Sequence, residues 1–162
     1  MLHLYRRESP TVEYCFNIET REALTPGELP TLRWLLTETF SPQEFGTQTL
    51  LVPGKGEKIL EIGPRLNFTT AFSTNAVNIV QACGLIKITR VERSCRYRIS
   101  AKDTAAFLAS HHDRMTECEY ARPLETFEVK ILPRPVIEVP LQQEGKAALC
   151  RLNKELGMGM DE

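Results

Sequence analysis

The sequence has little of what usually assigns a function. Its 162 residues carry a formal net charge of −1, so no strong field favours nucleic acid or an anionic membrane. No apolar run approaches the length of a bilayer span, and Met1 to Arg7 is too short for the apolar core of a signal peptide. These absences predict a soluble, cytoplasmic protein with no nucleic-acid partner and no membrane partner.

Cysteine is present, but not in a pattern typical of disulfides or zinc sites. The count is odd and no C-x-x-C motif occurs, which favours reduced thiols in a cytoplasmic protein. The five cysteines are Cys15, Cys83, Cys95, Cys118 and Cys150.

Catalytic motifs are also missing. The Gly-Lys-Gly of residues 54–56 lacks the G-x-x-x-x-G-K-[ST] spacing of a phosphate-binding loop, and a predicted strand follows it. Ser73 has no histidine near it in sequence, and no paired carboxylates are visible. His111, Met115 and Cys118 have the spacing of a soft-metal triad on a helix, but a histidine and a methionine on an apolar stripe more often belong to a core. We therefore predict no catalytic residue and no metal site in this chain.

The segment from Glu61 to Asn75 organises the rest of the chain. It joins a short apolar strand over 59–62 to a helix predicted over about 74–83. Ser73 is the predicted N-cap, and Phe72 with Val77 has the spacing of a hydrophobic staple. The free N–H groups of the first turn beside Arg65 would form a seat for an anion; the alternative is a capped connection with no ligand. The predicted inner face of the helix consists of Ala76, Ile79, Val80 and Cys83, and Gly84 is expected to end the helix.

Other patterns predict a mixture of strands and helices, and hence an α+β fold. Residues 86–99 alternate in two opposite phases, which predicts a strand with a bulge or break near Thr89–Val91. A helix is expected from Thr25 or, because of its proline, from Pro30, with an inner stripe of Leu29, Leu32, Leu36 and Phe40. The remaining predicted strands cover 2–5, 11–18, 47–52 and 58–62, the remaining helices 104–117 and 145–156, and an extended proline-containing arm begins at 122.

Several of these segments resemble one known family. Ile62 to Thr70, which reads Ile-Gly-Pro-Arg-Leu-Asn-Phe-Thr-Thr, is similar to the N-terminal region of the large, single-chain phosphoribosylformylglycinamidine synthases of purine biosynthesis. Further matches follow in the same order. They lie at Ser73–Asn75, Ala82–Leu85, Arg90–Arg93, Arg96–Arg98, His112–Glu117, Ala148–Asn153, Glu155–Gly157 and Asp161.

The resemblance implies a fold and a context. The family enzyme is a ligase and glutamine amidotransferase, which converts formylglycinamide ribonucleotide to the amidine with ATP, magnesium and ammonia from glutamine. Its N-terminal domain is similar to a fused pair of small accessory subunits, so we expect an antiparallel sheet with helices on one face, built from two diverged half-repeats. Residues 1–121 would be this domain, and 122–162 an arm and helix leading towards a missing linker domain. The family usually has a helix between the first two strands, where this chain has only Glu8–Pro10.

The resemblance also implies partners. Residues 158–162 give no natural stop, so we expect a fragment of a longer protein that carries the synthetase and glutaminase domains, as well as the ATP and magnesium sites. The chain itself would be a non-catalytic scaffold without a cofactor, coupling those two domains. The candidate interdomain or phosphate-facing residues are Arg65, Asn67, Thr69, Ser73, Thr74 and Asn75.

Two other hypotheses belong to different classes of protein. A stand-alone regulatory or assembly module, without catalytic domains, would dimerise or bind the intact enzyme through an exposed sheet edge. An RNA-binding sheet would use Arg96, Tyr97 and Arg98, although the near-zero net charge argues against it.

Overall fold

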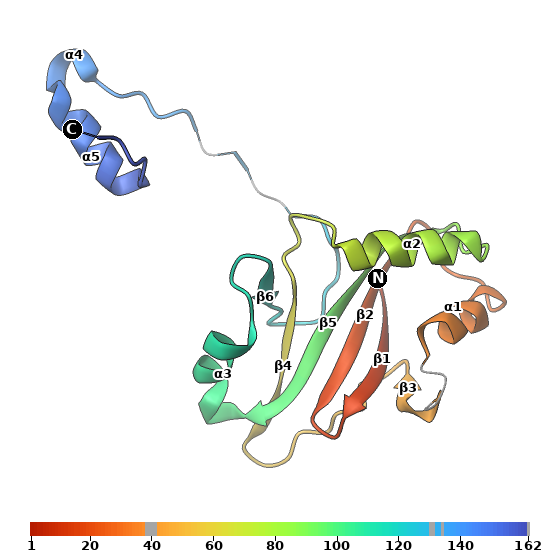
Figure 1. The fold of residues 1–162 in the computed structure, drawn as a ribbon. Helices are drawn as coiled ribbons and strands as arrows, with labels where there is room; N and C mark the ends of the chain where they lie inside the picture. The colour runs from red at the N-terminus through yellow and green to blue at the C-terminus, as the bar shows by residue number, and fades with distance from the viewer. Residues whose placement is uncertain (38–41, 130–131, 134, 162) are drawn as a thin grey trace. The chain divides into compact units, whose positions relative to one another are not determined.

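The computed structural model describes residues 1–37, 42–129, 132–133 and 135–161, and it consists of two compact units (Figure 1). The first unit is Met1–Val129 and the second is Lys130–Glu162. The strands of the first unit are β1 (Leu2–Ser9), β2 (Val12–Thr20), β3 (Phe45–Gly46), β4 (Glu57–Pro64), β5 (Ile88–Ser100) and β6 (Glu117–Glu119). Its helices are α1 (Glu28–Leu36), η1 (Pro42–Glu44), α2 (Ala71–Ala82), η2 (Ala101–Asp103) and α3 (Thr104–His111).

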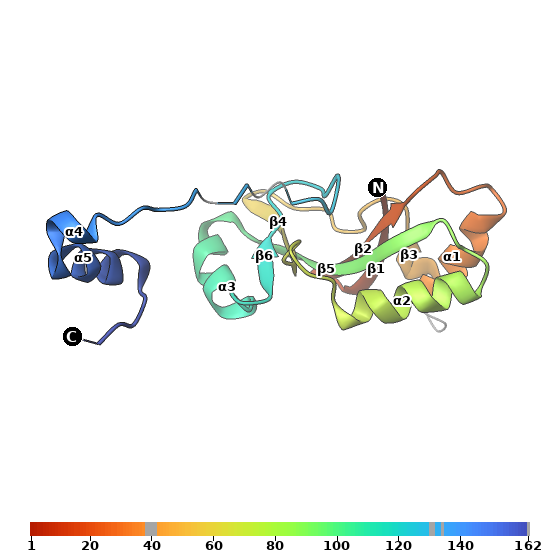
Figure 2. The same ribbon diagram turned by 90° about the horizontal axis from the view of Figure 1, so that it is seen from above.

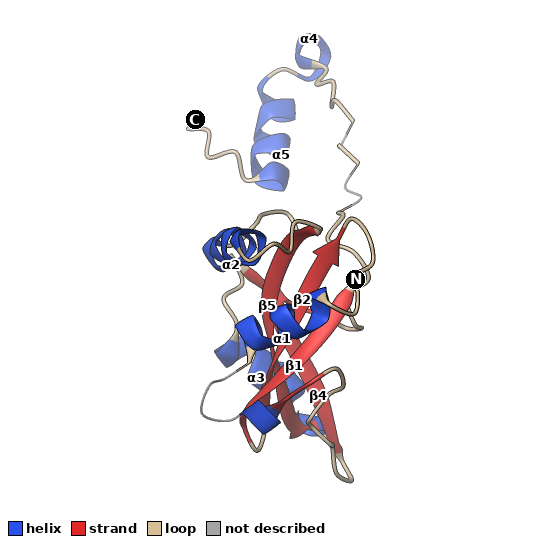
Figure 3. Ribbon diagram, turned by 90° about the vertical axis from the view of Figure 1, so that its right-hand side faces the viewer, coloured by secondary structure: helices blue, strands red, loops and turns tan. Residues whose placement is uncertain are grey.

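The six strands form one antiparallel sheet in the order β3-β1-β2-β5-β4-β6. The helices α1, α2 and α3 lie on the same side of this sheet, and extended segments cover the other side (Figure 2). In Figure 3 the strands form a single twisted layer, with α1 drawn in front of them and α2 beside their upper part. The predicted α+β class and antiparallel sheet are confirmed.

The main core lies between the sheet and the helices α1 and α2. Phe16 and Ile18 of β2 alternate towards the helices, as a period of two requires, and both are buried. Leu32 of α1 and Val80 of α2 belong to the same buried cluster. The complete buried cluster is Leu4, Phe16, Ile18, Leu32, Phe45, Val80, Leu85, Ile88 and Val91.

The bulge predicted near Thr89–Val91 is present in β5. Glu19 pairs with Arg90, but its neighbour Thr20 pairs with Ile88, so the register shifts by one residue at this point. The Thr89 hydroxyl then donates to the Glu19 carboxylate at 2.9 Å. Because of the extra residue, Ile88 and Val91 are both fully buried although three positions separate them.

The opposite face of the sheet carries a buried polar layer. Arg96 of β5 lies between two carboxylates, 2.5 Å from Glu13 of β2 and 3.1 Å from Glu61 of β4. Ser94 donates to Glu61 at 2.5 Å and accepts from the Asn17 amide at 3.0 Å. Ion pairs and hydrogen bonds offset the cost of removing these side chains from water, although the buried Arg96 Nε pairs with Glu61 without the geometry of a hydrogen bond.

The strand predicted over 47–52 is wrong, because this segment covers the polar layer instead of joining the sheet. The Glu13 carboxylate accepts from the Thr49 hydroxyl at 2.6 Å and from the Leu50 N–H at 2.7 Å. Arg7 donates to the Leu50 carbonyl and Arg98 to the Val52 carbonyl. These side-chain partners replace a backbone ladder.

Other boundaries also differ from prediction. The first strand continues to Ser9, because β1 and β2 form a hairpin along their whole length. The helix from 104 ends at His111, not at 117, since the Asp113 carboxylate accepts from the Met115 N–H at 2.8 Å and closes a turn. Met115 is consequently 83% exposed, and Cys118 belongs to β6. His111, Met115 and Cys118, considered above as a possible soft-metal triad, therefore do not share a helix face.

Helix α1 begins at Glu28, between the two predicted starts at Thr25 and Pro30, and its N-cap is Gly27. Thr25 and Glu28 nevertheless make the reciprocal hydrogen bonds of a capping box. The Thr25 N–H donates to the Glu28 carboxylate at 2.7 Å, and the Glu28 N–H donates to the Thr25 hydroxyl at 3.3 Å. Leu32 is fully buried, but Leu29, also assigned to the inner stripe, is 43% exposed. Phe40 lies outside the described residues.

The second unit contains α4 (Leu141–Glu144) and α5 (Lys146–Leu156), which confirms the predicted terminal helix. Gly157 ends α5 in the left-handed conformation, with φ 63°. Ala148 and Leu152 are its buried residues, whereas Leu149 and Leu156 are exposed.

Candidate functional site at the start of helix α2

The connection from β4 to α2 is capped three residues earlier than predicted. The N-cap is Thr70, whose hydroxyl accepts the Ser73 N–H at 3.1 Å, and α2 begins at Ala71. Ser73 is fully buried, and its hydroxyl accepts the Val91 N–H of β5 at 3.2 Å. Ser73 therefore holds α2 against the sheet, and Phe72 lies inside the first turn, where it cannot precede the cap as the staple required.

The positive end of α2 already faces a carboxylate of the same chain. Glu92 of β5 accepts from the Thr70 hydroxyl at 2.6 Å and from the Thr70 N–H at 3.2 Å. Arg90 contacts the same carboxylate at 2.9 Å, and Glu92 is only 1% exposed. The stabilisation that an anion gives to a helix N-terminus is thus supplied internally.

Arg65 connects the end of β4 to the turn before β6. Its guanidinium donates to the Arg114 carbonyl at 3.1 Å and 2.8 Å, and its backbone N–H donates to the Thr116 carbonyl at 2.9 Å. The residue remains exposed. One edge of the arginine is therefore fixed by the backbone of another segment, which sets its direction on the surface.

The remaining candidates are exposed and small. Asn67 and Thr69 lie in the loop before α2, whereas Thr74 and Asn75 lie on its first turns. The Thr74 hydroxyl donates to the Thr70 carbonyl at 3.3 Å. These side chains offer short donors and acceptors to a partner.

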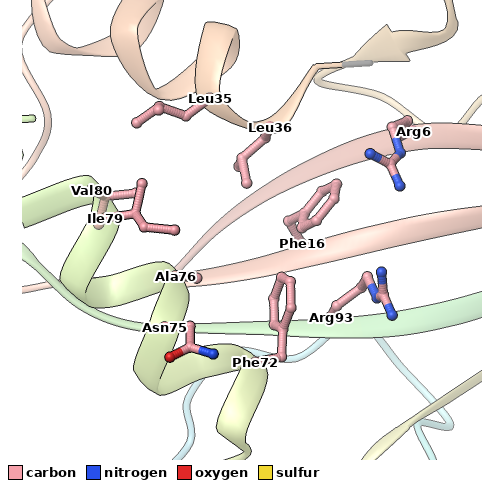
Figure 4. Close-up of a pocket in the computed structure, with 10 residues that line it drawn as sticks. All are labelled: Arg6, Phe16, Leu35, Leu36, Phe72, Asn75, Ala76, Ile79, Val80 and Arg93. Carbon is pink, nitrogen blue, oxygen red and sulfur yellow. The ribbon is translucent and has the colours of Figure 1, made fainter. Parts of the chain in front are cut away.

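Asn75 also lines a groove that the sequence did not reveal. The groove has a volume of about 300 Å³ and lies between α1, α2 and the sheet (Figure 4). Its residues are Arg6, Phe16, Leu35, Leu36, Phe72, Asn75, Ala76, Ile79, Val80 and Arg93. They come from five separate elements, β1, β2, α1, α2 and β5, so only the strand register and helix packing bring them together.

Both arginines of the groove, Arg6 and Arg93, lie against aromatic rings. The Arg93 guanidinium carbon is 4.5 Å from the centre of the Tyr14 ring and 5.1 Å from that of Phe72. The Arg6 guanidinium carbon is 5.3 Å from the Tyr14 ring and 5.7 Å from the Phe16 ring. Such contacts orient a cation without neutralising it.

Three of the cysteine thiols have raised pKa values, which makes them poor nucleophiles. Burial raises the pKa of the Cys15 thiol to about 12 and also raises the pKa values of Cys95 and Cys118. A thiol with a raised pKa stays protonated at neutral pH and is a weak nucleophile. Within the described ranges, no three or more histidine, cysteine and acidic residues are grouped so as to hold a metal ion.

Arg96 and Tyr97 of β5 lie on opposite faces of the sheet, so they do not form the shared surface that the RNA-binding hypothesis requires. Arg96 lies in the buried polar layer, whereas Tyr97 packs on the other side of the sheet, with its ring centre 5.0 Å from that of Phe107 in α3. Neighbouring residues of a strand point to opposite faces, which explains the separation.

The fold is thus an α+β domain with its candidate polar residues on a surface connection. Residues 13–128 match the family model of the formylglycinamide ribonucleotide amidotransferase N-terminal domain. The chain belongs to this family, which confirms the resemblance found in the sequence.

Relatives support the same assignment. The chain is 44% identical to a phosphoribosylformylglycinamidine synthase of Dictyostelium discoideum over 96% of its own length, and 38% identical to that of Homo sapiens over 92%. It is also 44% identical, over 95% of its length, to a probable phosphoribosylformylglycinamidine synthase of Arabidopsis thaliana described as chloroplastic/mitochondrial. It spans only 12% of the length of each of these relatives. In the part of the chain that the structure describes, no helix is long and apolar enough to cross a membrane.

Proposed function

We propose that this chain is the N-terminal scaffold domain of a phosphoribosylformylglycinamidine synthase. The whole enzyme would carry out the ATP- and glutamine-dependent amidation of formylglycinamide ribonucleotide in the cytoplasm. The observation that carries this proposal is the match of residues 13–128 to the N-terminal domain of that family. ATP, magnesium and the chemistry of glutamine would belong to the remaining polypeptide. The far greater length of the relatives favours this role over a stand-alone regulatory module.

We further propose that the sheet derives from two diverged half-repeats, related to the small accessory subunits. One would comprise β1, β2 and α1, and the other β4, α2 and β5, with the pairing of β2 and β5 joining them. In this chain, β1 and β2 form a direct hairpin and α1 follows β2. The helix of the first half covers the sheet from that later position.

The boundary between the accessory domain and the arm is proposed at residues 121 and 122. Leu124 and Phe127, in the first part of the arm, form a small buried cluster with Tyr120. The arm would then begin by lying along the domain before it leads towards a linker domain.

The exposed residues Arg65, Asn67, Thr69, Thr74 and Asn75 are proposed as a surface that contacts the synthetase and glutaminase domains. Short polar side chains around one oriented arginine suit an interface that is partly hydrated. Ser73 would act indirectly, since its buried hydroxyl holds α2 on the sheet. A phosphate-facing role has less support, because Glu92 already accepts from the N-cap residue of α2.

The test is the substitution Arg65→Ala in the full-length enzyme. If the surface couples the two domains, glutamine-dependent turnover should fall, while turnover with added ammonia should stay within about twofold, since free ammonia bypasses the coupling. Arg21→Ala is the matched control, because Arg21 is also an exposed arginine outside this surface. Unchanged glutamine-dependent kinetics and unchanged assembly in Arg65→Ala would contradict the proposal.

A further inference from the structure

We propose that the groove between α1, α2 and the sheet receives an apolar side chain with a neighbouring carboxylate, presented by the remaining polypeptide of the synthase. This inference rests on the proposed scaffold function, because it names the chemistry of the partner segment. The groove lies next to the proposed polar surface, but its walls are mainly apolar.

The walls of the groove select an apolar group. Phe16, Leu36, Phe72 and Val80 line it, and they come from β2, α1 and α2 (Figure 4). Its volume of about 300 Å³ accommodates one or two side chains of a docked segment. Ile79 on the α2 wall is 54% exposed, so an apolar partner would remove further apolar surface from water.

The charge of the groove selects an acidic neighbour. Arg93 lines it, and its guanidinium lies over the Tyr14 and Phe72 rings. Among the ion pairs of the described residues, none joins Arg93 to a carboxylate. Arg93 is exposed, so its guanidinium can be reached by a partner. The planar fork of guanidinium donors matches the two oxygens of a carboxylate, and such charge-assisted hydrogen bonds are stronger than neutral ones.

Two observations favour a polypeptide segment as the occupant. The chain spans 12% of the length of its relatives, so in an enzyme of that length most of the polypeptide would be tethered to this domain. Tethering raises the effective concentration of a docking segment, which makes a single small groove sufficient. Asn75 belongs both to the groove and to the proposed interdomain surface, so the two contacts would be continuous.

The experiment uses the full-length synthase with a specific protease site inserted after Val136, which is 92% exposed in the arm. After cleavage, the dissociation constant between the N-terminal piece and the remainder is measured in unmodified, Ile79→Glu and Arg93→Glu enzymes. Each substitution should raise it on the order of tenfold or more, as expected for a residue at the centre of an interface. Ala82→Glu is the matched control, because Ala82 is an exposed residue of the same helix outside the groove, and it should change the constant by less than about twofold.

The carboxylate is tested separately by salt. Binding of the unmodified pieces should weaken as ionic strength rises, and Arg93→Gln should reduce this dependence, since one ion pair is lost. Circular dichroism of each variant checks that the fold persists; Ile79→Glu decides the case if Arg93→Glu does not fold, because Ile79 is already half-exposed.

The outcomes separate this inference from the scaffold function. If Ile79→Glu and Arg93→Glu leave the dissociation constant unchanged while Arg65→Ala raises it, the groove is not the docking site and the scaffold function stands. If the cleaved pieces of the unmodified enzyme show no affinity for each other, both proposals are overturned.

Discussion

Replacing Gly63 with alanine gives the sharpest test of how Tyr120 and its cluster pack against β4. Gly63 lies in β4, and a Cβ atom added there would be 2.6 Å from the Cε2 and Cζ atoms of Tyr120 and 2.8 Å from its hydroxyl oxygen. Real Cβ atoms essentially never come so close to another atom. The ring of Tyr120 must therefore move in the Gly63→Ala protein.

The size of the effect follows from what Tyr120 would lose. Tyr120 is 9% exposed and packs with Leu124 and Phe127, and its hydroxyl donates to the Pro64 carbonyl at 2.5 Å. Displacing a packed ring costs about 1–3 kcal/mol, and a lost hydrogen bond adds about 1 kcal/mol. Restricting the unfolded chain by replacing glycine returns about 0.4–1 kcal/mol. We expect Gly63→Ala to lower the free energy of unfolding by about 2 kcal/mol.

The assay is urea unfolding followed by far-ultraviolet circular dichroism, because the single tryptophan, Trp34, is 75% exposed and would report little. A double-mutant cycle supplies the control. In a Tyr120→Ala background the obstacle is gone, so Gly63→Ala should be neutral or slightly stabilising there. An equal loss of stability in both backgrounds would refute the reasoning, since the cost would then not come from Tyr120.

Two further predictions concern α2 and the thiols. Thr70→Ala should lower the free energy of unfolding by about 1 kcal/mol, because the cap of α2 is lost. Glu92→Ala should lower it by more, because this change removes the acceptor of the Thr70 hydroxyl and leaves Arg90 without its buried partner. Equal effects of the two substitutions in thermal or urea unfolding would contradict this ranking. Iodoacetamide at pH 8 should label the exposed Cys83 and Cys150 within minutes, but Cys15 only after unfolding, because Cys15 is buried and its pKa is raised to about 12. Mass spectrometry of the labelled native protein measures the three rates. Labelling of Cys15 at the same rate as Cys83 would refute the burial of Cys15.

The elements that could be predicted from the sequence are those that local patterns determine. The strand over 11–18 follows from its β-branched and aromatic residues, and the bulge in β5 follows from the two phases of alternation. Gly84, with φ 88°, ends α2 as expected. The segment 47–52 has the composition of a strand, but its hydrogen-bond partners are the side chains of Glu13, Arg7 and Arg98. Such partners lie far away in sequence, so the pattern cannot distinguish a strand from a covering segment.

The connection that carries the candidate residues was predicted from the sequence, but the residue that caps its helix was not. Thr70 and Ser73 are both good capping residues, and the choice between them depends on Glu92 and Val91 of β5. The groove beside the site could not be predicted at all, because Arg93 and its neighbours meet only when the register of three strands is known.

The pairing of β2 with β5 has a consequence for synthesis of the protein. Thr20 ends β2 and pairs with Ile88, about 70 positions further along the chain. At translation rates of roughly 5–20 residues per second, β5 emerges about 4–14 seconds after β2. Until then the β1–β2 hairpin has only α1 and the two-residue strand β3 to pack or pair with, and a two-stranded hairpin by itself is at best marginally stable in water. The centre of the sheet must therefore wait for the second half of the domain, and folding begins late on the ribosome.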